Sequence, residues 1–144
     1  MEYEVTIGMA VYNVGKFIRM SLDSALAQTF ESIEFLILDD CGIDESMEIV
    51  REYQLKHPRG KNIRILSQPH NMGIGMARNR IVDEAQGRFL YFMDSDDSIT
   101  PNAIELLYSK AKQYNAQIVF GSYERVEEYH ETVQRVPIQY PSLL

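Results

Sequence analysis

Three carboxylate side chains fall within four positions in the second half of the chain, at Asp94, Asp96 and Asp97. The apolar run that precedes them, residues 87–93, contains three aromatic side chains and predicts a buried β-strand. Carboxylates this close repel one another, and a divalent cation that prefers hard oxygen ligands would relieve the repulsion. The other interpretation is an acidic turn that caps a helix beginning near Pro101. These residues alone leave both interpretations open.

Strand-like and helix-like segments alternate along the chain. The predicted strands are residues 5–11, 33–38, 63–66, 87–93 and 118–121, and the predicted helices are residues 16–28, 44–56, 73–85 and 101–114. This alternation predicts an α/β fold, with a mostly parallel central sheet and helices on both faces. Residues 123–137 alternate only partly and are rich in charge, which is typical of an edge hairpin or an extension.

The carboxyl ends of parallel strands lie at one edge of a sheet, and open α/β sheets bind ligands there. The first, second and fourth predicted strands all end at that edge. The residues expected there are Ala10, Tyr12, Asn13, Asp39, Asp40, Asp94, Ser95, Asp96 and Asp97. Helix capping accounts for one or two acidic residues at loop ends, so several that converge favour a binding site.

Length and composition exclude several classes of protein. A chain of 144 residues with 45% hydrophobic residues is expected to form one globular domain. The formal net charge of −7 argues against a nucleic-acid partner. Cys41 is the single cysteine, so no internal disulfide can form. Without a basic signal-peptide start, or an apolar run near the ~20 residues of a membrane span, we expect a cytoplasmic protein.

Five short motifs, in this order, together resemble the family 2 glycosyltransferases. They are Val11-Tyr12-Asn13-Val14, residues 22–30, Leu38-Asp39-Asp40, Ala77-Arg78-Asn79 and Asp94-Ser95-Asp96-Asp97. Each motif alone is weak, but the ordered set is specific, and it runs from residue 5 to residue 121. The resemblance implies a Rossmann-like GT-A fold, a nucleotide-sugar donor, a divalent cation (Mn²⁺ or Mg²⁺) and inversion of configuration at the transferred sugar.

The resemblance also implies roles for particular residues. The implied donor-binding residues are Ala10, Tyr12, Asn13, Asp40, Arg78, Asp94 and Ser95. Residues 10–13 would border the base and ribose, and Asp40 would accept a hydrogen bond from the base, usually uracil in this family. Asp94 and Asp96 match the family's Asp-x-Asp signature and would bind the metal. Asp97 either joins them or caps the next helix, and Asp39 serves the end of its strand.

These implications predict transfer of a sugar from a UDP-sugar to a hydroxyl of a glycan or lipid-linked acceptor, in cell-surface glycan synthesis. In similar enzymes the general base lies well beyond the Asp-x-Asp motif, and only 47 residues follow Asp97. We therefore expect the base beyond Leu144, because Glu124, Glu127, Glu128 and Glu131 are better explained as a solvated charged edge.

The expected organisation is a donor-binding domain at residues 5–122, followed by a charged extension or the start of an acceptor-binding half at residues 123–144. On this interpretation the chain is part of a longer enzyme, and segments outside it decide any peripheral association with a membrane. The alternative function is a non-catalytic module that binds nucleotide-sugars, since the sequence does not locate the general base.

Overall fold

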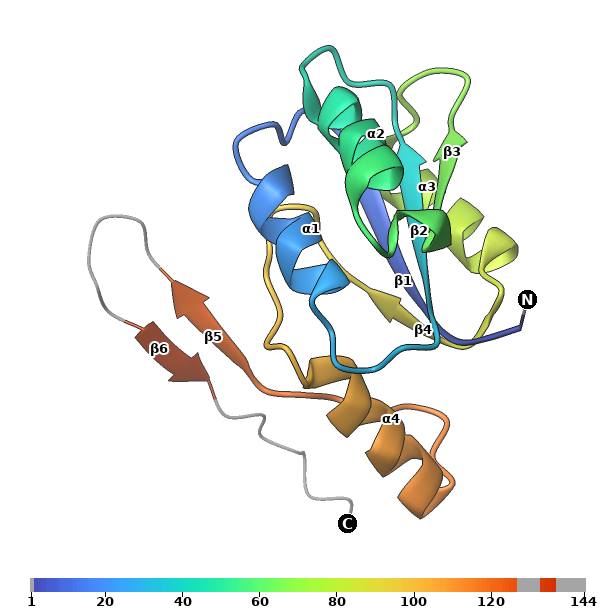
Figure 1. The fold of residues 1–144 in the computed structure, drawn as a ribbon, viewed down its shortest axis with the longest axis vertical. Helices are drawn as coiled ribbons and strands as arrows, with labels where there is room; N and C mark the ends of the chain where they lie inside the picture. The colour runs from blue at the N-terminus through green and yellow to red at the C-terminus, as the bar shows by residue number, and fades with distance from the viewer. Residues whose placement is uncertain (1, 127–132, 137–144) are drawn as a thin grey trace. The chain divides into compact units, whose positions relative to one another are not determined.

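The computed structural model describes residues 2–126 and 133–136, which belong to two compact units, Met1–Asn102 and Ala103–Leu144. The first unit contains a sheet of four parallel strands in the order β3-β2-β1-β4 (Figure 1). The strands are β1 (Tyr3–Val11), β2 (Ile33–Asp39), β3 (Ile63–Ser67) and β4 (Gly87–Phe92). All their carboxyl ends therefore lie at one edge, as the alternation of strands and helices predicts.

Helices cover both faces of this sheet. Helices α1 (Ile18–Leu26) and α2 (Ser46–Lys56) lie on one face, and α3 (Gly73–Glu84) lies on the other (Figure 1). Successive β2 side chains point to opposite faces, so Leu36 and Leu38 pack with Ala77 and Ile81 of α3. The run Ile33–Leu38 is buried throughout because both faces are covered, which explains why β2 is apolar without alternation except at Glu34.

Helix α3 rests directly on the backbone of β1 at Gly8. A Cβ atom built on Gly8 would lie 2.4 Å from the Cγ2 atom of Ile81, far inside ordinary van der Waals contact. The absence of a side chain at this position therefore sets how closely the helix approaches the sheet.

A buried charged network joins β1, β2 and β3. Glu34 is 2% exposed, and its carboxylate accepts hydrogen bonds from Thr6 Oγ1 at 2.6 Å and from Arg64 Nε at 2.8 Å. The backbone N–H of Gln86 donates a third hydrogen bond to this carboxylate, at 2.9 Å. A buried carboxylate is tolerated only with such partners, so this network fixes the register between the strands it joins.

Strand β4 differs from the prediction of a buried strand. It lies at an edge of the four-stranded sheet, none of its residues is buried, and Phe92 is 42% exposed. An apolar run predicts burial from its composition alone, whereas a strand with a neighbour on one side keeps part of its surface open. Burial begins one residue later, at Met93, which is 3% exposed.

The second unit contains helix α4 (Ala103–Tyr114) and an antiparallel hairpin of β5 (Tyr123–Val126) and β6 (Val133–Val136). The hairpin agrees with one of the two interpretations of residues 123–137. The predicted strand at 118–121 is wrong, since Ile118 and Phe120 are 72% and 67% exposed and no strand forms there. A strand requires a partner for its backbone N–H and C=O groups, and none of the described residues pairs with this segment.

The start of the fourth predicted helix differs from the structure. Helix α4 begins at Ala103 rather than at Pro101, because the carbonyl of Pro101 accepts the N–H of Thr29 at 2.8 Å and residues 101–102 form a turn. Glu127, Glu128 and Glu131 lie outside the described residues. Within residues 2–126 and 133–136, no helix combines the length and the apolar character needed to cross a bilayer.

Candidate functional site

The three clustered carboxylates lie on a β-turn at the end of β4, and we call residues Asp94–Asp97 the carboxylate turn. The N–H of Met93 donates to the carbonyl of Gly8 at 3.0 Å and extends the pairing of β4 with β1. The N–H of Asp97 then donates to the carbonyl of Asp94 at 3.0 Å, which closes the turn. The parallel sheet thus delivers this turn to its carboxyl edge.

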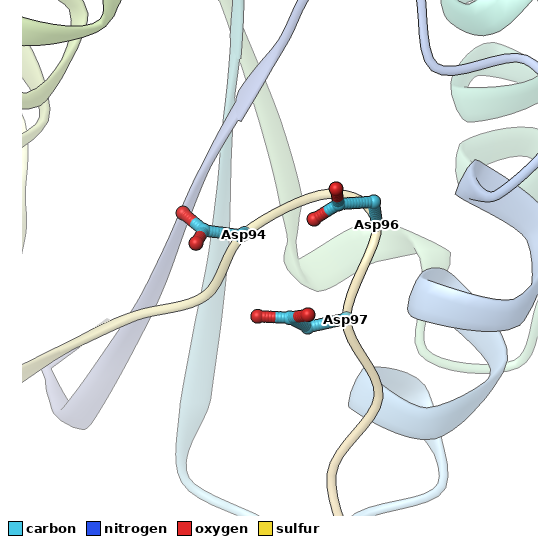
Figure 2. Close-up of side chains that lie close together, drawn as sticks. All are labelled: Asp94, Asp96 and Asp97. Carbon is cyan, nitrogen blue, oxygen red and sulfur yellow. The ribbon is translucent and has the colours of Figure 1, made fainter. Parts of the chain in front are cut away.

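The carboxylates of Asp94, Asp96 and Asp97 are exposed and lie close together (Figure 2). One oxygen atom can be chosen from each of Asp94, Asp96 and Asp97 such that all three lie within 4.8 Å of one another. The structure therefore brings together the two predicted metal residues and adds Asp97 to them. Of the two interpretations of Asp97, the geometry favours membership of this cluster.

Electrostatic repulsion within the cluster affects its titration. Desolvation raises the pKa of Asp97, and the negative charges of Asp96 and Asp94 raise it further. Desolvation also raises the pKa of Tyr91, and the charges of Asp97 and Asp94 add to that shift. The cluster is therefore a region of negative potential in which a bound cation would be stabilised.

Arg78 of α3 supplies a positive charge beside the cluster. Its Nη2 atom lies 3.0 Å from Oδ1 of Asp94, and both side chains are about half exposed (47% and 54%). An ion pair this exposed contributes little to stability, on the order of 0–1 kcal/mol. Its position matters more, since it places a guanidinium next to the carboxylates at the edge of the sheet.

The residues of the carboxylate turn fit a divalent cation by their chemistry. Three carboxylate oxygens within 4.8 Å are hard ligands of the kind that Mn²⁺ and Mg²⁺ prefer. Ligands supplied by one turn also leave coordination positions for the oxygens of a bound ligand or of water. Asp94, Asp96 and Asp97 are the residues that could hold such a cation.

Asp40 lies apart from this cluster and is only 3% exposed. Its carboxylate accepts hydrogen bonds from the N–H groups of Met72 and Gly73, at 3.0 and 3.1 Å, and from Nδ2 of Asn71 at 3.2 Å. Asp40 therefore caps the start of α3 and uses the hydrogen-bond donors at that helix terminus. The predicted hydrogen bond from Asp40 to a base stays a prediction.

The loop after β1 carries the other predicted donor-binding residues. Asn13 has a φ of +50°, and its Oδ1 accepts the N–H of Ile43 at 2.8 Å, which joins this loop to the loop after β2. A Cβ atom on Gly42 would lie 2.7 Å from that same oxygen, so glycine allows the two loops to touch. Tyr12 is 49% exposed at this edge, whereas Ala10 packs against the apolar cluster beneath α3.

Asp39 has a role in the local backbone, as predicted. Its Oδ1 accepts the N–H of Cys41 at 2.9 Å, and Cys41 has a φ of +61°. The short side chain of Asp39 thereby holds the turn that leaves β2.

Helix α1 holds the carboxylate turn, a function that the sequence prediction did not assign to it. The hydroxyl of Ser21 donates to the carbonyls of Ser95 and Asp97, at 2.8 and 2.5 Å. Ser95, a predicted donor-binding residue, is 6% exposed, so its side chain lies within the protein. The signal available in the sequence was the motif at residues 22–30, which supports the resemblance but suggests no chemistry by itself.

Comparisons with known proteins identify the family. The sequence model for glycosyl transferase family 2 matches residues 6–138. The chain belongs to glycosyltransferase family 2. This confirms the resemblance found in the motifs, and the match covers nearly all of the chain.

Members of the family with similar sequences are longer than this chain. Glycosyltransferase GlyG of Streptococcus pneumoniae serotype 4 is 31% identical over 124 residues, which are 86% of this chain and 40% of GlyG. Chondroitin synthase of Escherichia coli is 39% identical over 102 residues, which are 71% of this chain and 14% of that enzyme. This family 2 chain therefore spans less than half the length of these relatives.

Solved structures of family members confirm the predicted GT-A fold. The structure of residues 1–349 of S. aureus TarS in complex with UDP superposes with a TM-score of 0.72 and 27% sequence identity. The superposition covers 78% of this family 2 chain and 33% of the TarS chain.

Proposed function

We propose that this chain is the donor-binding part of an inverting glycosyltransferase that uses a UDP-sugar and a divalent cation. The acceptor is a hydroxyl of a glycan or lipid-linked substrate in polysaccharide or other cell-surface glycan synthesis. The observation that carries the proposal is the carboxylate turn, whose three side chains converge at the carboxyl edge of the sheet beside Arg78. Mn²⁺ or Mg²⁺ is the cation that this set of ligands fits.

Two similar proteins support a uridine nucleotide as part of the donor. TarS, at 27% identity, has been solved with UDP and with UDP-GlcNAc. The E. coli protein WfgD is 33% identical over 123 residues, and its name describes a glucosyltransferase that uses UDP-Glc and a diphosphoundecaprenol acceptor. Its acceptor supports a lipid-linked glycan as one substrate class for the whole protein.

Charge explains why the carboxylate turn suits this reaction. Carboxylates alone would repel the diphosphate of a nucleotide-sugar, so they act only as ligands of a cation. When bound, such a cation acts as a Lewis acid that stabilises negative charge on the departing diphosphate. Asp94, Asp96 and Asp97 would hold the cation, and Arg78, whose Nη2 atom lies 3.0 Å from Asp94, would add a second positive charge to the site.

The first-strand loop and Asp40 would contribute to the binding of the nucleotide. Tyr12 offers an exposed aromatic ring at the same edge of the sheet, suited to contact with a base or ribose. Asp40 holds the start of α3 and so positions Arg78, which lies on that helix. Under this proposal Arg78 binds the donor directly, whereas Asp40 acts at least by positioning.

Calorimetric titration of the chain with UDP tests the proposal. We expect binding in the presence of Mn²⁺, a loss of at least tenfold in affinity on chelation, and a similar loss in Asp96→Asn. Asp83→Asn is the matched control, because Asp83 is an exposed aspartate on α3, outside the carboxylate turn. Equal UDP affinity with and without Mn²⁺, or in Asp96→Asn and the parent chain, would contradict a cation-dependent donor site.

A second experiment separates an enzyme from a binding module. In the longer protein, hydrolysis or transfer of a UDP-sugar is expected, with loss of this activity in Asp96→Asn. UDP binding by the longer protein without any turnover would instead support a non-catalytic nucleotide-sugar-binding module.

A further inference from the structure

Three polar side chains, Ser21 and Ser24 of helix α1 and Gln28 just beyond its end, follow one another at spacings of three and four residues. Ser21 is 0% exposed and Gln28 is 4% exposed. The other buried residues of α1 are apolar or alanine: Ile18, Leu22, Ala25 and Leu26. A buried hydroxyl or amide costs free energy unless it is hydrogen-bonded, so these positions call for a specific explanation.

The side chains of these three residues all form hydrogen bonds with main-chain atoms of residues 95–100. The hydroxyl of Ser21 is shared between the carbonyls of Ser95 and Asp97, at 2.8 and 2.5 Å. These two carbonyls flank Asp96 in the sequence. Both carbonyls therefore face α1, whereas the side chain of Asp96 between them is exposed.

Ser24 and Gln28 continue the same attachment along the chain. The hydroxyl of Ser24 accepts the N–H of Ile99 at 3.2 Å and donates to the carbonyl of Ser21 at 3.0 Å. Nε2 of Gln28 donates to the carbonyl of Thr100 at 2.8 Å and to the carbonyl of Ser24 at 3.1 Å. The segment after the carboxylate turn is thus tied to α1 at successive positions.

This attachment opposes the repulsion within the carboxylate turn. Without a cation, the like charges of the three carboxylates, whose oxygens lie within 4.8 Å of one another, favour moving apart. Bonds to the main chain prevent the turn from opening while leaving the side chains free to bind. A site whose ligands are already held together loses less entropy when the cation binds.

We propose that Ser21 is a positioning residue that holds the carboxylate turn in the geometry for cation binding, with Ser24 and Gln28 in support. This inference rests on the proposed function for its cation, but not for the hydrogen bonds that define it. Ser21 itself contacts neither the cation nor the donor. It acts through the backbone of Ser95 and Asp97.

Two measurements on Ser21→Ala test the proposal, and Ser46→Ala is the matched control. Ser46 is also a buried serine, and its hydroxyl donates to Asp44 and accepts the N–H of Val14, away from the carboxylate turn. The first measurement is Mn²⁺ affinity, by electron paramagnetic resonance of free Mn²⁺. We expect Ser21→Ala to weaken it by about tenfold or more. Ser46→Ala is expected to leave it within about twofold of the parent.

The second measurement needs no cation. Hydrogen exchange at the N–H of Asp97, which closes the carboxylate turn, is expected to be about tenfold faster in Ser21→Ala and unchanged in Ser46→Ala. Urea unfolding of both variants gives their stabilities, so that a general loss of stability can be separated from a local opening. If Ser21→Ala does not fold, Ser24→Ala is measured in its place, with a smaller change expected in the same direction.

The outcomes separate this proposal from the proposed function. Unchanged Mn²⁺ affinity and unchanged exchange at Asp97 in Ser21→Ala would overturn the positioning role, as would equal losses in Ser46→Ala. Failure of the parent chain to bind Mn²⁺ would overturn the cation site of the proposed function. The exchange at Asp97 would then decide by itself whether Ser21 holds the turn.

Discussion

Replacing Asp40 by asparagine is expected to lower the free energy of unfolding by about 2–4 kcal/mol. Asparagine keeps the shape of the side chain but turns one of its two acceptor oxygens into an N–H donor. In the native structure those oxygens accept the N–H groups of Met72 and Gly73 and Nδ2 of Asn71. At least one of these part-buried donors would therefore face another donor.

Two contributions give this magnitude. An unpaired buried donor costs about 1–3 kcal/mol. Loss of a negative charge at the start of α3 costs from about 0.3 to 2 kcal/mol, with the upper part of the range suited to a site where the carboxylate is 3% exposed. With a urea m-value of about 2 kcal/mol/M, the unfolding midpoint should fall by about 1–2 M.

Urea unfolding followed by circular dichroism measures this change, and Asp39→Asn is the neighbouring control. Asp39 is partly exposed and accepts a hydrogen bond from Cys41 that asparagine can also accept, so the expected cost is below about 0.5 kcal/mol. The capping role inferred for Asp40 is refuted if Asp40→Asn unfolds at the parent midpoint. Equal losses of unfolding free energy in Asp40→Asn and Asp39→Asn would also refute it, because Asp40 accepts from three donors and Asp39 from the N–H of Cys41.

Three more predictions follow from the structure. Desolvation and the charges of Asp96 and Asp94 raise the pKa of Asp97, so Mn²⁺ affinity should be highest above that pKa and should fall as the pH drops through it. This fall should occur at a higher pH than for an ordinary aspartate, and electron paramagnetic resonance of free Mn²⁺ at a series of pH values measures it. Gly8→Ala places a Cβ 2.4 Å from Ile81 and should cost about 1–3 kcal/mol in urea unfolding, whereas a cost near zero would mean that α3 shifts freely. Glu34→Gln should lower the free energy of unfolding by about 2–4 kcal/mol, because the buried carboxylate pairs with the partly exposed Arg64. A decrease below about 1 kcal/mol, as for exposed ion pairs, would contradict a stabilising role of this network.

Local patterns predicted the parts of the fold that local forces determine. The apolar run of β2 and the spacing of apolar residues in α1 each predicted an element within two or three residues of its observed bounds. The clustering of the three carboxylates was predictable as well, because they are close in the sequence and the α/β topology fixes where β4 ends.

Other features depend on partners that are distant in the sequence. The acceptors for Ser21 lie 74 and 76 residues away, and the donors to Asp40 lie in a loop more than 30 residues away. The periodic spacing of apolar residues along the sequence does not predict such long-range pairings. The failed strand at residues 118–121 has the same cause, since an apolar segment becomes a strand only where a partner strand meets it.

The hydrogen bonds between α1 and the carboxylate turn involve main-chain atoms of the turn, so they do not depend on which side chains the turn carries. Ser21 donates to carbonyl oxygens, which every amino acid possesses, so exchanging the side chains at Asp94, Asp96 or Asp97 need not disturb these hydrogen bonds. Under the proposed function, metal preference at this turn could therefore evolve, or be engineered, one side chain at a time.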